Sequence, residues 1–216
     1  SMSVKEPDVR YASWLMVFND EMKRELFNAE LSEIMERFDS FEVYRRYYNR
    51  RNGELIDKML YTDEKTWLVD TYLEKTDKAS MAVGLEVRVP FLDHELVEFA
   101  ATILPKYKIN GFTKKYILKK AMSDLLPENV IKKPKHGFSV PTDPWFRGKL
   151  KEYVFEVLFD SQACGRGYFN YPYIEKLYRA HIDGKEVYDF HLWLLLNFEL
   201  WHRAFMDRCQ RIFEVD

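Results

Sequence analysis

Apolar residues recur every three or four positions through the first third of the chain, which is the spacing of an amphipathic helix. This pattern predicts two helices between Tyr11 and Phe38, interrupted near Asn28. Further helices are predicted over residues 40–51 and 54–72. The strict alternation of apolar and polar residues that marks a strand does not occur in this part of the sequence. The expected fold class is therefore mainly α.

The composition is that of a folded protein with balanced charge. The 216 residues are 47% hydrophobic and carry a formal net charge of −2, so they can fill a core but lack the basic excess of a nucleic-acid binder. No uninterrupted apolar stretch reaches the roughly 18 to 20 residues that span a membrane. Residues 1–3 are interpreted as an expression remnant, and residues 4–216 are predicted to form a single helical domain.

The spacing of cysteines and histidines predicts no metal site. Cys164 and Cys209 match neither a disulfide framework nor a zinc-binding motif. His181, His191 and His202 show no pairing at a separation of four, so we interpret them as core or boundary histidines with satisfied ring nitrogens. We expect a protein of the reducing cytoplasm with no bound structural metal.

The segment Ile131–Lys151 concentrates positive charge in an otherwise balanced chain. Six lysines and arginines stand there against one acid, Asp143, and three prolines interrupt any helix until about Trp145. A stiff cationic loop suits an anion, and an ordinary solvated basic loop is the alternative interpretation. The cationic residues are Lys132, Lys133, Lys135, Arg147, Lys149 and Lys151.

A lysine-rich helix is predicted just before this segment, with Thr113 as its N-cap and Pro127 at its end. On a helical projection, Lys114 falls within the apolar stripe and Lys115 lies toward its edge. Cations in a first helical turn oppose the helix dipole, and a bound phosphate would reverse that effect. Alternatively, the long side chains carry their charges out to water, which is the interpretation we favour for Lys114.

A second charged stretch surrounds Pro90. Glu86 and Arg88 alternate with apolar residues, so we predict a partly buried ion-pair network that also includes Asp93. Pro90 excludes the preceding residue from helical conformation, and Asp93 is placed to cap a helix that begins at His94.

The most apolar part of the sequence lies near its end. Residues Tyr188–Phe205 are apolar on nearly every face of a helix, which predicts a buried helix and not a groove for a partner. Another helix is predicted over residues 172–181, followed by a turn at Asp183-Gly184.

Four motifs, in this order, resemble the synthetase domain of the glutamine-hydrolysing, B-type asparagine synthetases. They read YLEKTDKASMAVGLEVRVPFLDHELVEFA, TKKYILKKA, KPKHGFSVPTDPWFRG and ELWHRAF. The resemblance implies the helical C-terminal part of an α/β synthetase domain of the PP-loop type. Its parallel-sheet half, with an SGGxDS-type pyrophosphate loop, is missing from this sequence, so the chain is expected to be a fragment that is inactive alone.

The resemblance also implies a reaction. In such enzymes, Mg-ATP adenylates the side-chain carboxylate of aspartate, and ammonia from glutamine displaces AMP to give asparagine. The implied cofactors are therefore ATP and magnesium. The implied partners are aspartate and glutamine-derived ammonia, with a homodimer as a further expectation and with neither nucleic acid nor membrane.

Roles for individual residues follow from the same resemblance. Lys135 is similar to the family lysine that contacts pyrophosphate and stabilises negative charge, so it is the expected catalytic residue. Lys115 matches a second phosphate-contacting lysine, and Gly137, which has no Cβ, would let its backbone approach the same oxygens. Substrate positioning or a structural role is implied for five others: Glu74, Asp77, Glu86, Arg88 and Asp93.

Two other functions stay open at this point. An enzyme with the same adenylation chemistry but a different acceptor, such as a β-lactam synthetase or a related amidotransferase, would share Lys115 and Lys135. A non-catalytic binding module is the alternative from another class.

Overall fold

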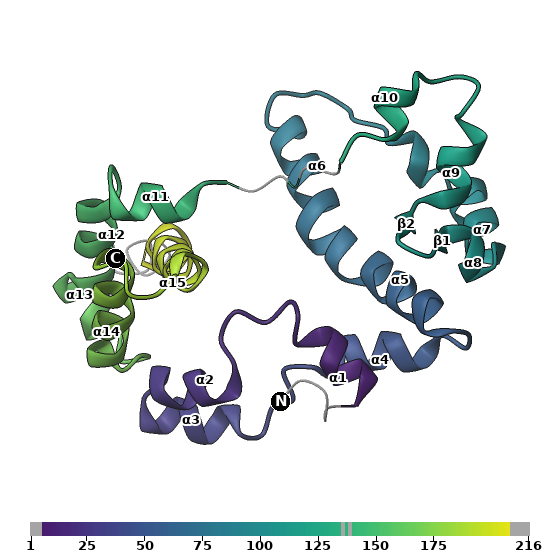
Figure 1. Ribbon diagram of the computed structural model, residues 1–216. Coiled ribbons are helices and arrows are strands. Elements are labelled where there is room, and N and C mark those ends of the chain that lie inside the picture. Colours follow the sequence, from purple (N-terminus) through teal and green to yellow (C-terminus); the bar gives the residue numbers. More distant parts are fainter. Residues whose placement is uncertain (1–5, 135–136, 138–139, 208–216) are drawn as a thin grey trace. The chain divides into compact units, whose positions relative to one another are not determined.

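Helices dominate the structure, a computed structural model that describes residues 6–134, 137 and 140–207 (Figure 1). The mainly helical fold class is thereby confirmed. The part of the chain that the structure describes contains one sheet, which has two strands.

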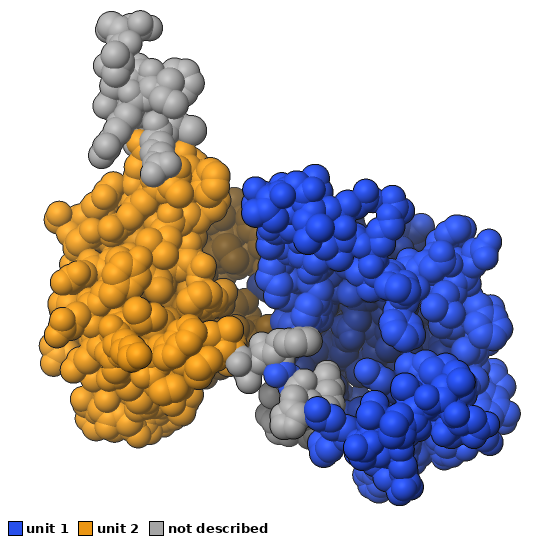
Figure 2. Space-filling view, turned by 90° about the horizontal axis from the view of Figure 1, so that it is seen from above, with its two compact units in different colours: residues 1–14, 40–137 blue, residues 15–39, 138–216 orange. Residues whose placement is uncertain are grey.

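The chain divides into two compact units, which Figure 2 shows in different colours. Unit 1 comprises residues 1–14 and 40–137, and unit 2 comprises residues 15–39 and 138–216. The single domain expected over residues 4–216 stays a prediction.

Unit 1 is built from short helices and a hairpin. α4 and α5 pack against each other, and α1 packs against α4. A short π-helical segment, η2, carries α5 on into α6. The elements are α1 (Pro7–Ala12), α4 (Glu42–Arg50), α5 (Leu55–Lys65), η2 (Leu68–Leu73), α6 (Glu74–Met81), η3 (Pro90–Leu92), α7 (His94–Thr102), α8 (Pro105–Lys108), β1 (Ile109–Asn110), β2 (Thr113–Lys114), α9 (Tyr116–Ala121) and α10 (Glu128–Ile131).

Polar contacts join the helices of unit 1. The Tyr11 hydroxyl of α1 donates to the Asp63 carboxylate of α5, and burial beside that carboxylate raises the pKa of Tyr11. Lys108 of α8 forms an ion pair of 2.9 Å with Asp57 of α5, and both side chains are mostly buried. These contacts tie helices together whose sequence positions lie about 50 residues apart.

A β-hairpin stands where the lysine-rich helix was predicted to begin. Asn110 pairs with Thr113 across an antiparallel turn, and Gly111 has a φ of 58° that favours glycine. Helix α9 therefore begins at Tyr116, so the prediction of Thr113 as its N-cap is wrong. Lys114 lies in strand β2 and not on a helical stripe.

The elements of unit 2, as far as the structure describes it, are helices, and an isolated β-bridge joins Phe27 to Phe169. α11 and α12 both pack against α15, and α2 packs against α14. The elements are α2 (Asp20–Leu26), α3 (Ala29–Met35), α11 (Thr142–Arg147), α12 (Lys151–Phe159), α13 (Ser161–Gly165), α14 (Tyr171–Ile182), α15 (Asp189–Trp201) and the π-helical η4 (His202–Met206).

Asparagine side chains define where the first helices of unit 2 begin. The Asn28 side chain accepts a hydrogen bond of 2.7 Å from the Leu31 amide at the start of α3, which confirms the predicted break. Asn19 caps α2 in the same way through the Met22 amide. The chain between α1 and α2 is irregular, so the first predicted helix is not continuous.

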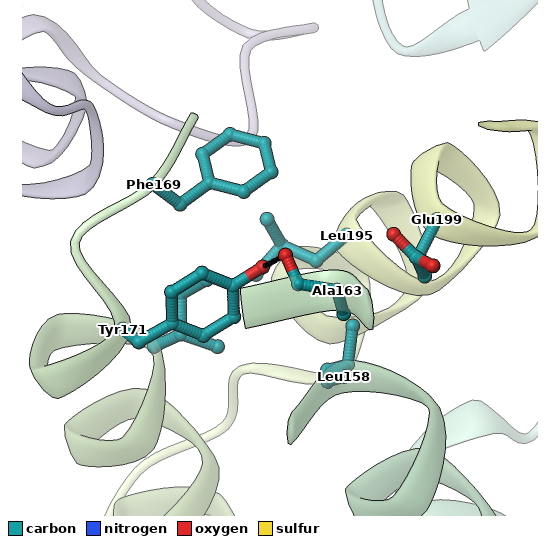
Figure 3. A pocket seen from close by; sticks show the side chains of 7 residues that line it. Leu158, Ala163, Phe169, Tyr171, Leu195 and Glu199 are labelled. Carbon is teal, nitrogen blue, oxygen red and sulfur yellow. Dashed lines mark hydrogen bonds between the residues drawn. The ribbon is translucent and has the colours of Figure 1, made fainter. Parts of the chain in front are cut away.

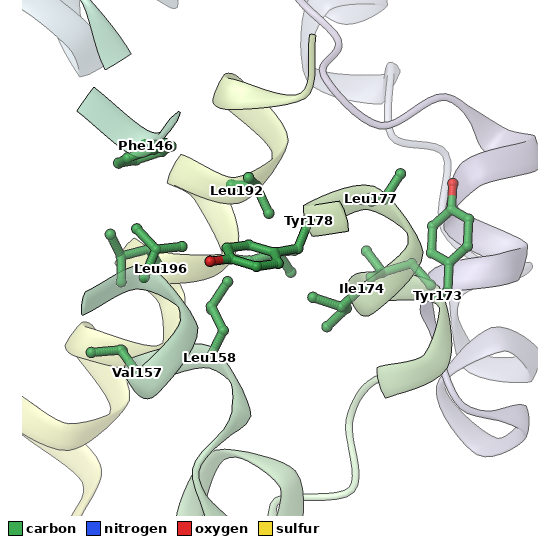
Figure 4. Close-up of a cluster of buried hydrophobic side chains, with 12 residues drawn as sticks. Phe146, Val157, Leu158, Tyr173, Ile174, Leu177, Tyr178, Leu192 and Leu196 are labelled. Atoms are coloured by element: carbon green, nitrogen blue, oxygen red, sulfur yellow. The ribbon is translucent and has the colours of Figure 1, made fainter. Parts of the chain in front are cut away.

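The core of unit 2 lies between α11, α12, α14 and α15 (Figure 4). Phe146, Val154 and Leu192 are fully buried there, and Leu26 of α2 joins them. Side chains from segments more than 100 residues apart thus share one apolar cluster.

Helix α15 buries one face only. Leu192, Leu195 and Leu196 face the core, whereas Phe190 is 61% exposed and Trp193 is 41% exposed. The prediction of a helix buried on every face is therefore wrong, because apolar residues that surround a helix do not reveal which side has a neighbour.

The histidines of unit 2 divide into two kinds. His202 contacts the Tyr168 hydroxyl and the Asp207 carboxylate, at 3.2 Å each, as predicted for a satisfied histidine. The prediction holds only in part for the other two: the Tyr188 amide donates to His181 Nδ1, but His181 Nε2 and His191 Nδ1 are buried without a hydrogen-bond partner among the described residues. Burial lowers the pKa of both imidazoles.

Candidate functional site

Lys115 has the left-handed backbone conformation, with φ 57° and ψ 37°, at the point where the hairpin passes into α9. Among the residues that the structure describes, it is the one non-glycine with a positive φ. This conformation costs an L-residue about 1–2 kcal/mol, and such strain concentrates at functional sites. The strain marks Lys115 as a candidate independently of its charge.

Two adjacent cations are presented to solvent at this junction. Lys114 and Lys115 are both exposed, and neither forms an ion pair with the residues that the structure describes. Their ammonium groups are therefore free to meet an anion, so the chemistry of these donors fits a phosphate group. The helix dipole gives less reason to expect a phosphate here than the sequence suggested, because α9 has only 6 residues and begins after both lysines.

Gly137 is the one described residue within the run 135–139. A Cβ added there would meet nothing within 4 Å, so the fold itself does not require glycine at this position. The close approach of its backbone to phosphate oxygens stays a prediction. Lys135, the expected catalytic residue, lies outside the described residues, and its role likewise stays a prediction.

Glu86 and Arg88 form an ion pair of 2.5 Å in the extended segment after α6. Their side chains are 69% and 86% exposed, so the predicted burial of this pair is wrong. The reason is local: Val87 and Val89, the apolar neighbours expected to pack, are themselves exposed. Both charged groups are thus accessible.

The remaining acidic candidates differ in how they are used. The Asp93 carboxylate accepts from the Glu95 and Leu96 amides at 3.1 and 3.3 Å, which confirms its predicted role as the cap of α7. Glu74 pairs with Lys78 at 2.5 Å on the exposed face of α6. Asp77 lies exposed one turn further along the same helix.

The structure joins these candidates only in part. Glu86 meets Arg88, but within the described ranges no hydrogen bond or ion pair links that pair to Lys115 or Gly137. All of these residues belong to unit 1. Within the same ranges there is no group of three His, Cys, Asp or Glu side chains that could hold a metal ion.

Sequence reasoning missed a cluster of charges in unit 2. Arg166 donates to both oxygens of Glu199 at 2.7 and 3.0 Å and to Asp207 at 2.8 and 2.9 Å. Arg203, four residues after Glu199 in the adjoining η4, donates to Glu199 as well. The hydrogen bonds from Arg166 lower the pKa of Asp207 to about 2. The spacing of Glu199 and Arg203 was the available sequence signal.

A small hollow lies beside this cluster (Figure 3). The Tyr171 hydroxyl at its wall donates to the Ala163 carbonyl, and burial raises the pKa of Tyr171 to about 12. Glu199, its one charged residue, is already bound by Arg166. The hollow thus offers no uncommitted charge to a ligand, and we interpret it as part of the core. It is lined by Leu158, Ala163, Phe169, Tyr171, Ile174, Leu195 and Glu199.

The motifs, the helical architecture and the exposed lysines agree with the matches to known proteins. The chain belongs to the asparagine synthase family, whose model matches residues 5–203. It is 31% identical over 194 residues to asparagine synthetase [glutamine-hydrolyzing] 1 of Bacillus subtilis, an alignment that covers 89% of this chain and 30% of the relative.

Other relatives bear the same kind of name. A putative asparagine synthetase [glutamine-hydrolyzing] of Mycobacterium bovis is 33% identical over 191 residues, covering 85% of this chain and 29% of that protein. Human asparagine synthetase [glutamine-hydrolyzing] is 30% identical over 137 residues, covering 56% of this chain and 24% of the human protein. No solved structure matches the chain.

The chain spans about 30% of the length of the first of these relatives. None of the helices in the described part of the chain combines the length and the apolar character needed to cross a membrane. The matches therefore show the family to which the chain belongs, and each covers only a portion of the relative.

Proposed function

We propose that this chain is the helical C-terminal part of an ATP- and magnesium-dependent ligase that adenylates the side-chain carboxylate of aspartate and transfers glutamine-derived ammonia to it. The products would be asparagine, AMP and pyrophosphate. Family membership and the names of the relatives support the product. The observation that carries the proposal is the strained, exposed backbone of Lys115 next to Lys114.

The proposed contribution of the chain is positive charge held against phosphate. Transfer of an adenylyl group builds negative charge on phosphate oxygens and releases a polyanion, so fixed cations stabilise the transition state. Lys115 would hold one phosphate group, and Lys135 would stabilise the charge that develops on pyrophosphate. The backbone of Gly137 would approach the same oxygens.

The exposed acidic residues of unit 1 are assigned to substrate positioning. Glu86 and Arg88 are accessible and form an ion pair with each other, which suits groups that must orient a ligand. Glu74 and Asp77 are placed in the same class, with less structural support. Asp93 is assigned to the fold, because its carboxylate caps α7.

Pyrophosphate release tests the proposal. The enzyme to use is the complete synthetase, that is, this chain joined to the segments by which its relatives are longer. With ATP, aspartate and ammonia we expect pyrophosphate release, and Lys135→Ala should lower its rate by about 10² or more. Lys120→Ala, an exposed lysine of α9 outside the proposed site, is the matched control and should change little.

Two results would contradict the proposal in different ways. If the enzyme turns over only with another carboxylate, the adenylation chemistry stands but aspartate is not the acceptor, as in a β-lactam synthetase. A complete enzyme that releases no pyrophosphate with any carboxylate would support a binding module. This chain alone is expected to be inactive.

A further inference from the structure

The second half of unit 1 has no core of its own. From Trp67 to Pro134, a stretch that the structure describes in full, Pro105 is the one buried residue. Unit 2, in contrast, gathers 12 buried side chains in one cluster. Burial of apolar surface is the main source of folding stability, so this stretch of unit 1 needs a partner that covers it.

Helix α7 shows this need most clearly. It contacts η3, yet none of its residues from His94 to Thr102 is buried. Its apolar side chains face water: Phe99 is 63% exposed and Leu96 is 41% exposed. A helix of 9 residues is not stable in water by itself, because its few hydrogen bonds do not repay the ordering of the backbone. Its apolar face therefore requires a neighbour.

The elements around α7 expose further phenylalanines. Phe91 of η3 is 65% exposed, and Phe112, between strands β1 and β2, is fully exposed. η3 contacts α7, and α8 contacts both β1 and α9 (Figure 1). Since one phenylalanine can bury roughly 150–250 Å², Phe91, Phe99 and Phe112 leave on the order of 400 Å² of apolar surface open to water. Exposed apolar surface of this extent marks an interaction site.

The matches to known proteins indicate what covers these rings. The family model includes the whole stretch from Trp67 to Pro134, so the relatives contain it as well. The chain spans 30% and 29% of the first two relatives described above, which therefore bring much additional polypeptide. Segments of the same polypeptide act at a high effective concentration, so they compete well against a second copy of the chain.

We propose that Phe91, Phe99 and Phe112 form a docking surface for the segments that complete the synthetase. These segments would present an apolar surface that takes the three rings out of water. Strand β2, which follows Phe112, carries Lys114 and leads directly into Lys115. Docking at Phe112 would thus also fix the place of both lysines. The inference rests on the proposed function, which supplies the complete synthetase, but not on which carboxylate that enzyme activates.

Hydroxyl-radical footprinting read by mass spectrometry tests the docking surface directly. In this chain alone, Phe91, Phe99 and Phe112 should be oxidised as readily as Phe38, which is 65% exposed in unit 2. In the complete synthetase we expect their oxidation rates to fall at least about fivefold and that of Phe38 to stay within about twofold, because the centre of an interface excludes water. Phe146, which is fully buried, is the unreactive reference in both proteins.

Three results would overturn the proposal. The first is unchanged oxidation of the three rings in the complete synthetase. The second is equal protection of Phe38, which would mean that the protection is not specific to this surface. The third is protection already present in this chain alone, in which case sedimentation shows whether a second copy is the occupant.

Substitution of Phe112 connects docking with activity. In this chain, neither Phe112→Ser nor the control Phe38→Ser should shift the urea midpoint, because both rings already face water. In the complete synthetase, Phe112→Ser should lower kcat/KM for pyrophosphate release roughly tenfold or more, since Lys115 is no longer held in place. Phe112→Leu keeps an apolar contact and should stay within about threefold of the parent, as should Phe38→Ser.

The activity measurement can fail in two distinguishable ways. Unchanged kcat/KM in Phe112→Ser would reject Phe112 as part of the docking surface. A parent synthetase that releases no pyrophosphate with any carboxylate would reject the proposed function, whereas the footprint would still report whether the three rings are covered. The footprint also decides the question if Phe112→Ser does not fold, because it uses the unsubstituted proteins.

Discussion

Arg166 and Glu199 form a two-pronged ion pair, with both carboxylate oxygens of Glu199 accepting from one guanidinium at 2.7 and 3.0 Å. The side chains are 9% and 5% exposed, so water screens the pair little. The pair joins the segment after α13 to the last turns of α15. It is a buried polar contact of unit 2.

Loss of this pair should destabilise the fold. Glu199→Gln removes one of the carboxylates that face Arg166 and Arg203, and we expect the free energy of unfolding to fall by about 2 kcal/mol, since charged hydrogen bonds are lost while Arg166 keeps Asp207 and Arg203 keeps Asp160. Urea unfolding of this chain measures the change. Glu33→Gln is the control, because its ion pair with Arg37 is 73% exposed on both sides and should contribute less than about 1 kcal/mol. Equal losses in the two variants would contradict the prediction.

Stability should fall as the pH drops below about 6.5, because burial lowers the pKa of His181 and His191 in the folded state. The positive charge of Arg147 lowers the pKa of His181 further, whereas the negative charges of Asp143 and Asp189 raise it. Below about pH 6.5 the unfolded chain therefore binds more protons than the folded one. The loss of stability begins near the pKa that these histidines have in the unfolded chain and grows as the pH approaches their lower pKa in the folded chain.

Substitution of one buried histidine tests this pH dependence. The His191 ring packs edge-on against Phe18 and Tyr188, so His191→Phe keeps an aromatic ring among aromatic neighbours. The urea midpoint of this variant should fall less between pH 7.5 and 5.5 than that of the parent. His94→Gln, which changes an exposed histidine, should leave the slope unchanged. A parent slope retained in His191→Phe would argue against this histidine as the source.

The strain at Lys115 can be separated from its charge. Lys115→Gly should be more stable than Lys115→Ala by about 1 kcal/mol, because glycine adopts the left-handed conformation without a Cβ penalty. Both variants should lose pyrophosphate release in the complete synthetase, since both remove the cation. Thermal unfolding and the release assay measure the two effects on the same proteins. Full activity in Lys115→Gly would show that the charge is dispensable.

The exposed Glu86–Arg88 pair offers a test of a site role against a structural one. Glu86→Gln should change the free energy of unfolding by less than about 1 kcal/mol, as expected for a solvated ion pair. If the pair positions substrate, the same change should lower kcat/KM of the complete synthetase by at least roughly tenfold. Glu128→Gln is the matched control for Glu86→Gln, because it also breaks an exposed ion pair, with Lys132, and Glu128 lies outside the family motif that contains Glu86. Equal activity of the two variants would remove Glu86 from the site.

Local sequence rules predicted helix ends well where one side chain decides them. Asn28 and Asp93 cap helices with their own oxygens, so both positions could be read from the sequence. The hairpin before α9 was missed although Asn110-Gly111 is a turn signal, because the apolar stripe beyond it was extended too far back.

Properties that depend on tertiary neighbours could not be predicted. Phe190 of α15 is exposed, and so is Glu86 in the segment before Pro90. In each case the exposure depends on whether another segment packs against that residue. The bond between Thr142 and Asp189 joins positions 47 apart, and no local spacing signals it. Of the candidate site, the family motifs supplied the residues, local sequence rules supplied the cap at Asp93, and the structure supplied the strain at Lys115.

The interleaved division of the chain has a consequence for its synthesis on the ribosome. Residues 15–39 and residues 138–216 form one unit. The ribosome therefore completes α2 and α3 long before it makes the segments against which they pack. Phe27 stacks on Phe169, and the Asn28 side chain donates to the Gly167 carbonyl. A premature stop codon between residues 138 and 167 would therefore leave α2 and α3 without these partners, although every residue of unit 1 up to 137 would already have been translated.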